Sequence, residues 1–308
     1  MTVWLAGNGV VGKRFTQLFD GVAVTTFDPR RDPLPEMTNG DVVVLAYPGR
    51  HRSLVEQSGA LGASVITLAD DLNDTQQLFE LGTIFEKNGA SLVIGSGMSP
   101  GLSGLIARHL SSRLDRVDEI HIAMHGTAGP ACARVHHRSL SGHSPGYIDG
   151  DWKEFHGGSG RELCWFPEPV GAVDCYRAES PLPILLHRAF PEVRRISSRR
   201  SATRRDRLTA RLPMLRPPHA EGGVGALRVE VRGAATSGSR ETYVMGIAEL
   251  VGSASAAVIA AMITELIASG LPSGIIIPGA ERLPTNRLLH HVQELGIRIQ
   301  EFTGQPSD

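Results

Sequence analysis

This sequence has few cysteines, few lysines and a net charge close to zero, and each of these features excludes some classes of function. The 308 residues include three cysteines, Cys132, Cys164 and Cys175, whose spacing fits neither a disulfide framework nor a standard zinc pattern. The formal net charge is −1, so the charge balance favours neither nucleic acid nor an acidic membrane surface as a partner. We therefore expect a cytoplasmic protein with no disulfide framework, no metal site, no nucleic-acid partner and no membrane partner.

Long apolar runs are also absent. The longest uncharged apolar stretch, residues 250–264, is shorter than a membrane span and predicts a buried helix. The first residues already have the pattern of a strand and a glycine loop, so we expect no signal peptide. Lysine occurs only as Lys13, Lys87 and Lys153, which leaves few candidates for a catalytic lysine.

What the sequence does have is a glycine motif near its start. The apolar run 3–6 leads into the Gly-x-Gly-x-x-Gly segment 7–12, and apolar residues at helical spacing follow. In a dinucleotide site Gly7 makes the turn, Gly9 lets the backbone approach a pyrophosphate, and Gly12 lets the helix lie close to the strand. The alternative is a glycine-rich turn with no ligand. We predict a cofactor site formed by Gly7, Asn8, Gly9, Val10, Val11 and Gly12, with the phosphates at the start of the helix.

The second predicted strand, 22–27, bears on which nicotinamide cofactor is bound. It ends at Asp28, where a ribose-binding carboxylate is expected. Asp28 can accept hydrogen bonds from the ribose and would repel a 2′-phosphate, whereas Arg30 and Arg31 could pair with such a phosphate. We favour NAD over NADP, and the alternative is a surface turn of solvated charges.

The pattern up to residue 118 is that of an α/β fold. Apolar strands are predicted at 41–46, 64–69 and 91–95, and the segments between and after them have helical spacing. Three prolines within 29–35 predict that one crossover helix is missing. This alternation predicts a Rossmann-type doubly wound parallel sheet. Ala46, Tyr47 and Pro48 would end one strand at the ligand-binding edge, or form only a turn.

After residue 118 the pattern changes. Residues 119–125 and 227–233 alternate apolar and polar, as antiparallel strands with one exposed face do. Between them little helical periodicity is found before about residue 182. Helices at 253–269 and 284–294 and strands at 274–278 and 296–300 would return to the first sheet. We predict a Rossmann domain of residues 1–118 plus 248–308, and an inserted α+β substrate and dimerisation domain of residues 119–247.

Three blocks of the chain together resemble the saccharopine dehydrogenase family of oxidoreductases. They are the glycine motif 7–12, the segment Gly95-Ser-Gly-Met-Ser-Pro-Gly-Leu102, and the run from Gly252 to Ile299. The likeness covers the first 115 residues and about the last 60. The resemblance implies a Rossmann domain interrupted by a substrate and dimerisation domain, a homodimer, and NAD(P)-linked chemistry on an amino acid or an imine derived from one. The chain departs from the family in its shortened crossover at 29–40 and in lacking an assignable lysine–histidine acid–base pair.

The remaining site predictions concern substrate and proton transfer. The segment 98–101 lies at the carboxyl end of a strand and opens a helix, so its backbone N–H groups could hold a substrate carboxylate, with capping by Ser99 as the alternative. His125 is the candidate proton donor, although an exposed strand-end histidine is the commoner case. Arginine can bind a carboxylate bidentately. The assigned residues are Ser96 and Met98 for the cofactor and Ser99, Pro100, Gly101, Arg134 and Arg177 for the substrate.

Two further patterns bear on the choice of function. Nine arginines crowd residues 188–211, and we interpret them as a solvated or interface-pairing face because no aromatic residues alternate with them as in a nucleic-acid site. No tyrosine is followed by lysine four residues later, which excludes the short-chain dehydrogenase pattern. The sequence thus predicts an NAD(P)-dependent oxidoreductase acting on a small, carboxylate-bearing substrate. The alternative is a catalytically inactive NAD(P)-binding sensor with the same fold.

Overall fold

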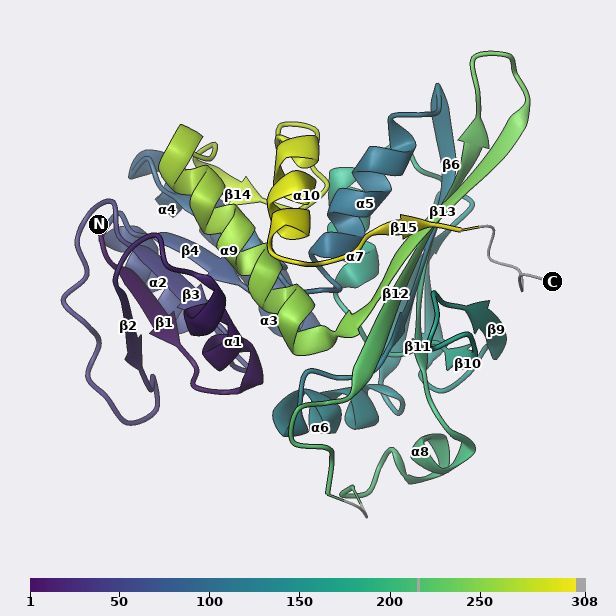
Figure 1. The fold of residues 1–308 in the computed structure, drawn as a ribbon, viewed down its shortest axis with the longest axis horizontal. Helices are drawn as coiled ribbons and strands as arrows, with labels where there is room; N and C mark the ends of the chain where they lie inside the picture. The colour runs from purple at the N-terminus through teal and green to yellow at the C-terminus, as the bar shows by residue number, and fades with distance from the viewer. Residues whose placement is uncertain (215–216, 303–308) are drawn as a thin grey trace.

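The first sheet consists of short parallel strands in the order β14-β5-β4-β3-β1-β2 (Figure 1). The computed structural model describes residues 1–214 and 217–302. The strands β3, β4 and β5 are buried throughout, as expected for a sheet with helices on both faces. The strands of this sheet are β1 (Val3–Ala6), β2 (Val24–Phe27), β3 (Val42–Leu45), β4 (Ser64–Thr67), β5 (Ser91–Ile94) and β14 (Gly274–Ile276).

The strand order places the ligand-binding edge at β1. Strands β2 and β3 lie on opposite sides of β1, so the direction of winding reverses there, and open α/β sheets bind ligands at such a point. Residues 28–41, all described by the structure, contain no helix, which confirms the predicted loss of one crossover helix. The Rossmann-type doubly wound prediction is confirmed.

Helices cover this sheet and connect it to the second one. Helix α1 packs against α9, while α2 and α4 pack on β4, β5 and β14. By length and composition α9 could cross a membrane, yet most of it is buried inside the protein, as predicted for a core helix. The helices of this part are α1 (Val10–Leu18), α2 (Arg52–Ala60), α3 (Leu72–Leu78), the 3-10 helix η1 (Phe79–Leu81), α4 (Gly82–Lys87), α9 (Val251–Ser269) and α10 (Thr285–Glu294).

The second sheet is mixed and has the order β15-β13-β12-β6-β11-β10-β9, with β7 pairing to both β11 and β8. The two amphipathic strands predicted from the sequence are β6 and β12. Ile120 and Ile122 of β6 enter the main core, whereas Glu119 and His121 lie on the other face. The strands are β6 (Arg116–His125), β7 (His143–Ile148), β8 (Asp151–His156), β9 (Glu162–Trp165), β10 (Ala172–Tyr176), β11 (Arg195–Ser201), β12 (Val224–Ala234), β13 (Arg240–Leu250) and β15 (Gln300–Glu301).

Helix α5 contacts both parts of the molecule. It packs on β12 and β13 of the second sheet and on α9 and α10, and Figure 1 shows it beside α10 between the two sheets. The other helices near the second sheet are short. The bounds are α5 (Leu102–Ser111), α6 (Pro130–Ser139), α7 (Leu182–Ala189) and α8 (Arg204–Thr209).

Two sequence predictions about elements are wrong. Helix α6 lies in a region where no helix was expected, because its buried positions are few, Ala133 and His137, and leave no apolar periodicity. The predicted strand 296–300 is reduced to β15, which pairs with β13 of the second sheet rather than joining the first. The free edge of β13 supplies its hydrogen-bond partners.

Candidate functional site

The β1–α1 turn has the geometry that the glycine motif predicts. Gly7 has φ +119°, and a Cβ there would lie 2.6 Å from the carbonyl oxygen of Ala46 at the end of β3. A side chain at Gly12 would clash with the carbonyl oxygen of Gly7. At Gly9 a Cβ would meet nothing within 4 Å, so this residue faces open space. Gly7 and Gly12 are therefore required by packing, whereas Gly9 leaves room for a ligand to approach the backbone.

A cavity of about 530 Å³ opens above this turn and collects most of the residues that the sequence singled out. It also lies within the size range of small-molecule sites. The predicted residues that line it are Gly7, Asn8, Gly9, Val10, Val11, Ala46, Tyr47, Pro48, Met98, Ser99, Pro100 and Arg134. Gly12, Ser96 and Gly101 do not line it: Gly12 lies in the first turn of helix α1, and Ser96 and Gly101 lie in the segment between β5 and α5.

Several helices begin at this cavity. Lining residues include Val10 at the start of α1, Pro130 at the start of α6, Pro181 just before α7, and Val251 at the start of α9. The first turn of a helix carries N–H groups without intrahelical partners and the positive end of the helix dipole, and several such turns border this cavity. The Met98 N–H donates to Ser255 Oγ at 3.0 Å, which fixes the loop after β5 to α9. This arrangement favours an anionic ligand.

A neighbouring cavity of about 430 Å³ shares Tyr47 and Pro48 with the first. Arg30 and Arg50 line it, together with residues of α2. Asp28 does not line it: its Oδ1 accepts the Arg30 N–H at 3.0 Å, and its Oδ2 lies 3.8 Å from Arg31 Nε. The Asp28 carboxylate, predicted to bind ribose, is thus directed into its own turn, whereas Arg30 and Arg50 line the cavity.

A polar cluster that the sequence did not reveal lines the main cavity. It joins Asp70, just beyond β4, with Cys132 and His136 of α6 and Arg200 of β11. The Arg200 guanidinium donates to His136 Nε2, and Cys132 Sγ lies 3.3 Å from the same nitrogen. Arg200 makes no ion pair with any residue of 1–214 or 217–302. Within this same range, no group of three histidine, cysteine, aspartate or glutamate side chains is arranged to hold a metal ion.

The pKa values in this cluster follow from burial. Burial lowers the pKa of Arg200 to about 10, so the side chain remains a cation at neutral pH. Burial, and then the Arg200 charge, hold the pKa of His136 well below its usual range. Burial raises the pKa of Asp70, whose Oδ1 is enclosed and has no hydrogen-bond partner in the part of the chain that the structure describes. Perturbed groups gathered in a cavity are typical of functional sites.

The cluster was missed for identifiable reasons. Cys132 and His136 are four residues apart on a helix that the sequence did not predict. Arg200 could have been found from strand alternation, since Arg199 and Arg200 must point to opposite faces of β11. Asp70 follows a correctly predicted strand, so the carboxyl-edge rule already pointed to it.

The predicted proton donor, His125, and the predicted substrate residue Arg177 also lie outside the main cavity. His125 lines a side cavity of about 340 Å³ that shares Met124, His136 and Arg200 with the main one. Its Nδ1 is 2.9 Å from Ser201 Oγ, and burial lowers its pKa. Arg177 lies at a fourth cavity, where its guanidinium stacks on Phe155 at 4.0 Å.

The comparisons with known proteins bear on this fold. No family model and no curated protein matches the sequence. Apo saccharopine dehydrogenase (L-Glu forming) from Saccharomyces cerevisiae matches 98% of this chain and 100% of its own, with a TM-score of 0.65 and 14% identity. The chain has the fold of that dehydrogenase. A mutant meso-DAPDH from Clostridium tetani E88, solved with DAP, covers 93% of this chain and 95% of its own, with a TM-score of 0.50 and 15% identity. The resemblance read from the three sequence blocks is confirmed at the level of the fold.

Proposed function

We propose that the protein is an NAD(P)-dependent oxidoreductase that transfers a hydride between the nicotinamide and a carbon–nitrogen or carbonyl centre of an amino-acid-derived substrate. One observation carries this proposal: the Gly7–Gly12 turn, the 98–100 loop and the Arg200 cation all border the same cavity. The proposal treats residues 1–118 with 248–308 as the dinucleotide-binding domain, residues 119–247 as the substrate domain, and the protein as a cytoplasmic homodimer.

The residues present fit a nicotinamide dinucleotide. The open space at Gly9 and the start of α1 would receive the pyrophosphate, while Tyr47 and Pro48 connect the main cavity to the one that would hold the adenosine. When bound, the nicotinamide supplies the hydride donor or acceptor. Two arginines, Arg30 and Arg50, line the adenosine side against the carboxylate of Asp32, and Asp28 is directed into its turn. We therefore propose NADP as the preferred form, in place of the NAD favoured by the sequence pattern.

Arg200 is the group we assign to the substrate carboxylate. A partly buried guanidinium without a carboxylate partner is costly, and an anionic ligand offsets that cost. Ser99 and the first turn of α6 border the same space, and the N–H groups of Ala131 and Cys132 in that turn have no intrahelical partner. Arg134, the arginine chosen from the sequence, lines the outer part of the same cavity on the exposed side of α6.

Asp70 is the group we assign to proton transfer. Its raised pKa lets the carboxyl hold a proton closer to neutral pH than an ordinary aspartate does, and its unpartnered Oδ1 belongs to a side chain that lines the cavity. His136 lines the same space but is held neutral. Asp70 therefore takes the role first given to His125, which lies in the side cavity.

Two measurements test the proposal. Fluorescence titration with NADPH and NADH measures binding, and we expect NADPH to bind more tightly by tenfold or more. A screen of 2-oxo acids with amino acids or ammonium then measures cofactor oxidation. Binding without turnover above background would favour the alternative, an inactive sensor. If neither nucleotide binds, both functions fail.

A further inference from the structure

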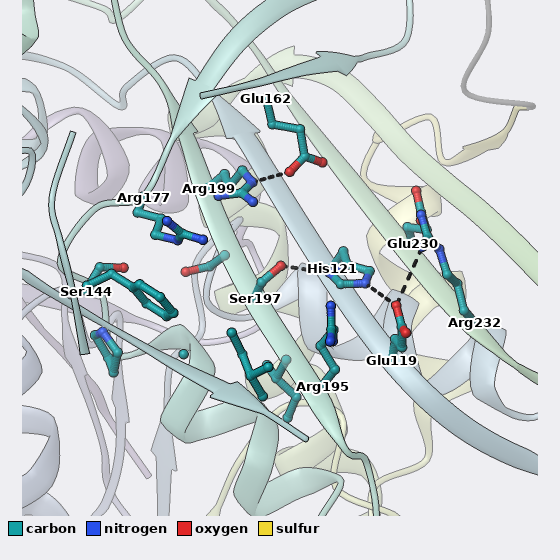
Figure 2. A pocket seen from close by; sticks show the side chains of 16 residues that line it. Glu119, His121, Ser144, Glu162, Arg177, Arg195, Ser197, Arg199, Glu230 and Arg232 are labelled. Carbon is teal, nitrogen blue, oxygen red and sulfur yellow. Dashed lines mark hydrogen bonds and ion pairs between the residues drawn. The ribbon is translucent and has the colours of Figure 1, made fainter. Parts of the chain in front are cut away.

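The cavity that contains Arg177 is drawn in Figure 2, and the alternation of side chains along β11 places it on the opposite face of the second sheet from the proposed cofactor site. Arg199 and Arg200 are neighbours on β11, and only Arg199 lines this cavity, whereas Arg200 lines the main one. The cavity has a volume of about 230 Å³. This is below the range of roughly 300–1,000 Å³ for drug-sized ligands, so an occupant must be small.

Four arginines line this cavity, and three of them have carboxylate partners. Arg195 pairs with Asp149 at 3.2 Å, Arg199 with Glu162 at 2.5 Å, and Arg232 with Glu119 at 3.5 Å. The fourth, Arg177, makes no ion pair with any residue of 1–214 or 217–302. Figure 2 shows its guanidinium directed toward the side of the cavity where Arg199 lies.

Arg177 and Arg199 are held close together despite their like charges. Burial, and then the charge of Arg199, lower the pKa of Arg177. Nη1 of Arg199 is enclosed and has no hydrogen-bond partner in the described part of the chain. The ring of Phe155 supports the Arg177 guanidinium and fixes its orientation. Two oriented guanidiniums with unused N–H donors are complementary to an oxyanion.

The rest of the lining supports the same ligand chemistry. Ser144 also lines the cavity (Figure 2). Ser197 is already hydrogen-bonded: its Oγ lies 2.7 Å from Nδ1 of His121. The other ring nitrogen of His121 lies 2.8 Å from the Glu119 carboxylate. Since these neighbours are already paired, the unused donors are concentrated around Arg177.

We propose that this cavity is a second ligand site, separate from the cofactor cavity, that binds a small molecule carrying a phosphate or a carboxylate through Arg177 and Arg199. The carboxylates of Glu119, Glu162 and Glu230, which also line it, disfavour an extended polyanion such as nucleic acid. The site does not depend on the oxidoreductase function.

The test is calorimetric titration of the full-length protein with inorganic phosphate and, separately, with succinate in low-chloride buffer, which distinguishes the two sources of the anion. We expect wild type to bind at least one with a Kd of about 1 mM or tighter. Arg177→Gln should weaken that binding at least tenfold. The anion affinity of Arg177→Lys should lie between those of wild type and Arg177→Gln. Arg240→Gln is the matched control, because Arg240 is exposed on the same sheet, pairs with Asp118 and lies outside the cavity.

Gly9→Asp separates this site from the cofactor site. It alters only the main cavity, which also favours anions, so the binding event assigned to this second site is the one that Arg177→Gln weakens and Gly9→Asp leaves unchanged. The proposal is overturned if neither anion binds to wild type, or if Arg177→Gln, shown to be folded by circular dichroism, binds as tightly as wild type. It is also overturned if anion binding is absent and the substitution instead changes the sedimentation coefficient, since a second copy of the chain would then cover this face.

Discussion

At the level of single residues, the raised pKa that suits Asp70 to proton transfer also lowers the stability of the folded protein at neutral pH. Because burial raises its pKa, the folded protein holds this proton more tightly than the unfolded chain does. Stability therefore falls as pH rises from the unfolded-state pKa of about 4 through the folded-state value, and the full penalty is present above that value.

Replacing Asp70 should accordingly raise the stability of the protein and lower its turnover. We expect Asp70→Asn to unfold at higher urea concentration than wild type at pH 7, with the difference shrinking toward zero below about pH 4. Turnover should fall because Asn cannot transfer the proton. The exposed Asp20→Asn is the control and should show no such pH-dependent difference. A destabilised Asp70→Asn protein at neutral pH would contradict this account.

Arg200 gives a prediction about substrate affinity. Removing one member of an enclosed charge pair costs about 2 kcal/mol or more, which is roughly a 30-fold effect. We expect Arg200→Gln to raise KM for a carboxylate substrate by at least that factor. Loss of the cation should also raise the pKa of His136, which NMR titration of the ring protons measures.

Arg138→Gln serves as the matched control, since Arg138 is on α6 but lies outside the cavity lining. An unchanged KM in Arg200→Gln would mean that another residue binds the carboxylate.

At the level of elements, the sequence predicts what local pattern determines. The strands β3, β4 and β5 were found because burial on both faces requires continuous apolar runs such as Val42–Leu45. The glycine turn was found because only glycine fits at Gly7 and Gly12. Helix α6 was missed because Pro130 and its histidines carry no apolar stripe. The pairing of β15 was mispredicted because partner choice depends on which sheet edge is free.

The contact between α9 and α10 yields a prediction about stability. Glu265 is 1% exposed and binds Arg287 through two hydrogen bonds, at 2.7 and 2.5 Å. Arg287→Ala would leave a buried carboxylate without a partner, at a cost of about 3 kcal/mol in the free energy of unfolding. The double variant Glu265→Met/Arg287→Met should recover most of this loss. Urea unfolding of the three proteins measures both effects, and a single variant as stable as wild type would contradict the account.

At the level of the whole molecule, the main cavity is assembled from segments that are far apart in the chain. The glycine turn comes from residues 7–12, the loop after β5 from 97–100, the start of α6 from 128–136, and the start of α9 from 251–255. Each glycine loop could be recognised from the sequence by itself. The proximity of Asp70, His136 and Arg200 could not be predicted from the sequence, since it depends on how the second sheet packs against the first.

The measurement that most directly tests the central claim is the thermal stability of three proteins with and without NADPH. Gly9 caps α1 and faces open space, so both Gly9→Asn and Gly9→Asp should fold as well as wild type. They differ in one charge at the position proposed for the pyrophosphate. NADPH at 100 times its Kd should raise the melting temperature of wild type by roughly 5 °C. The account predicts a smaller rise in Gly9→Asn and none in Gly9→Asp, whereas a rise in Gly9→Asp equal to that of wild type would contradict it.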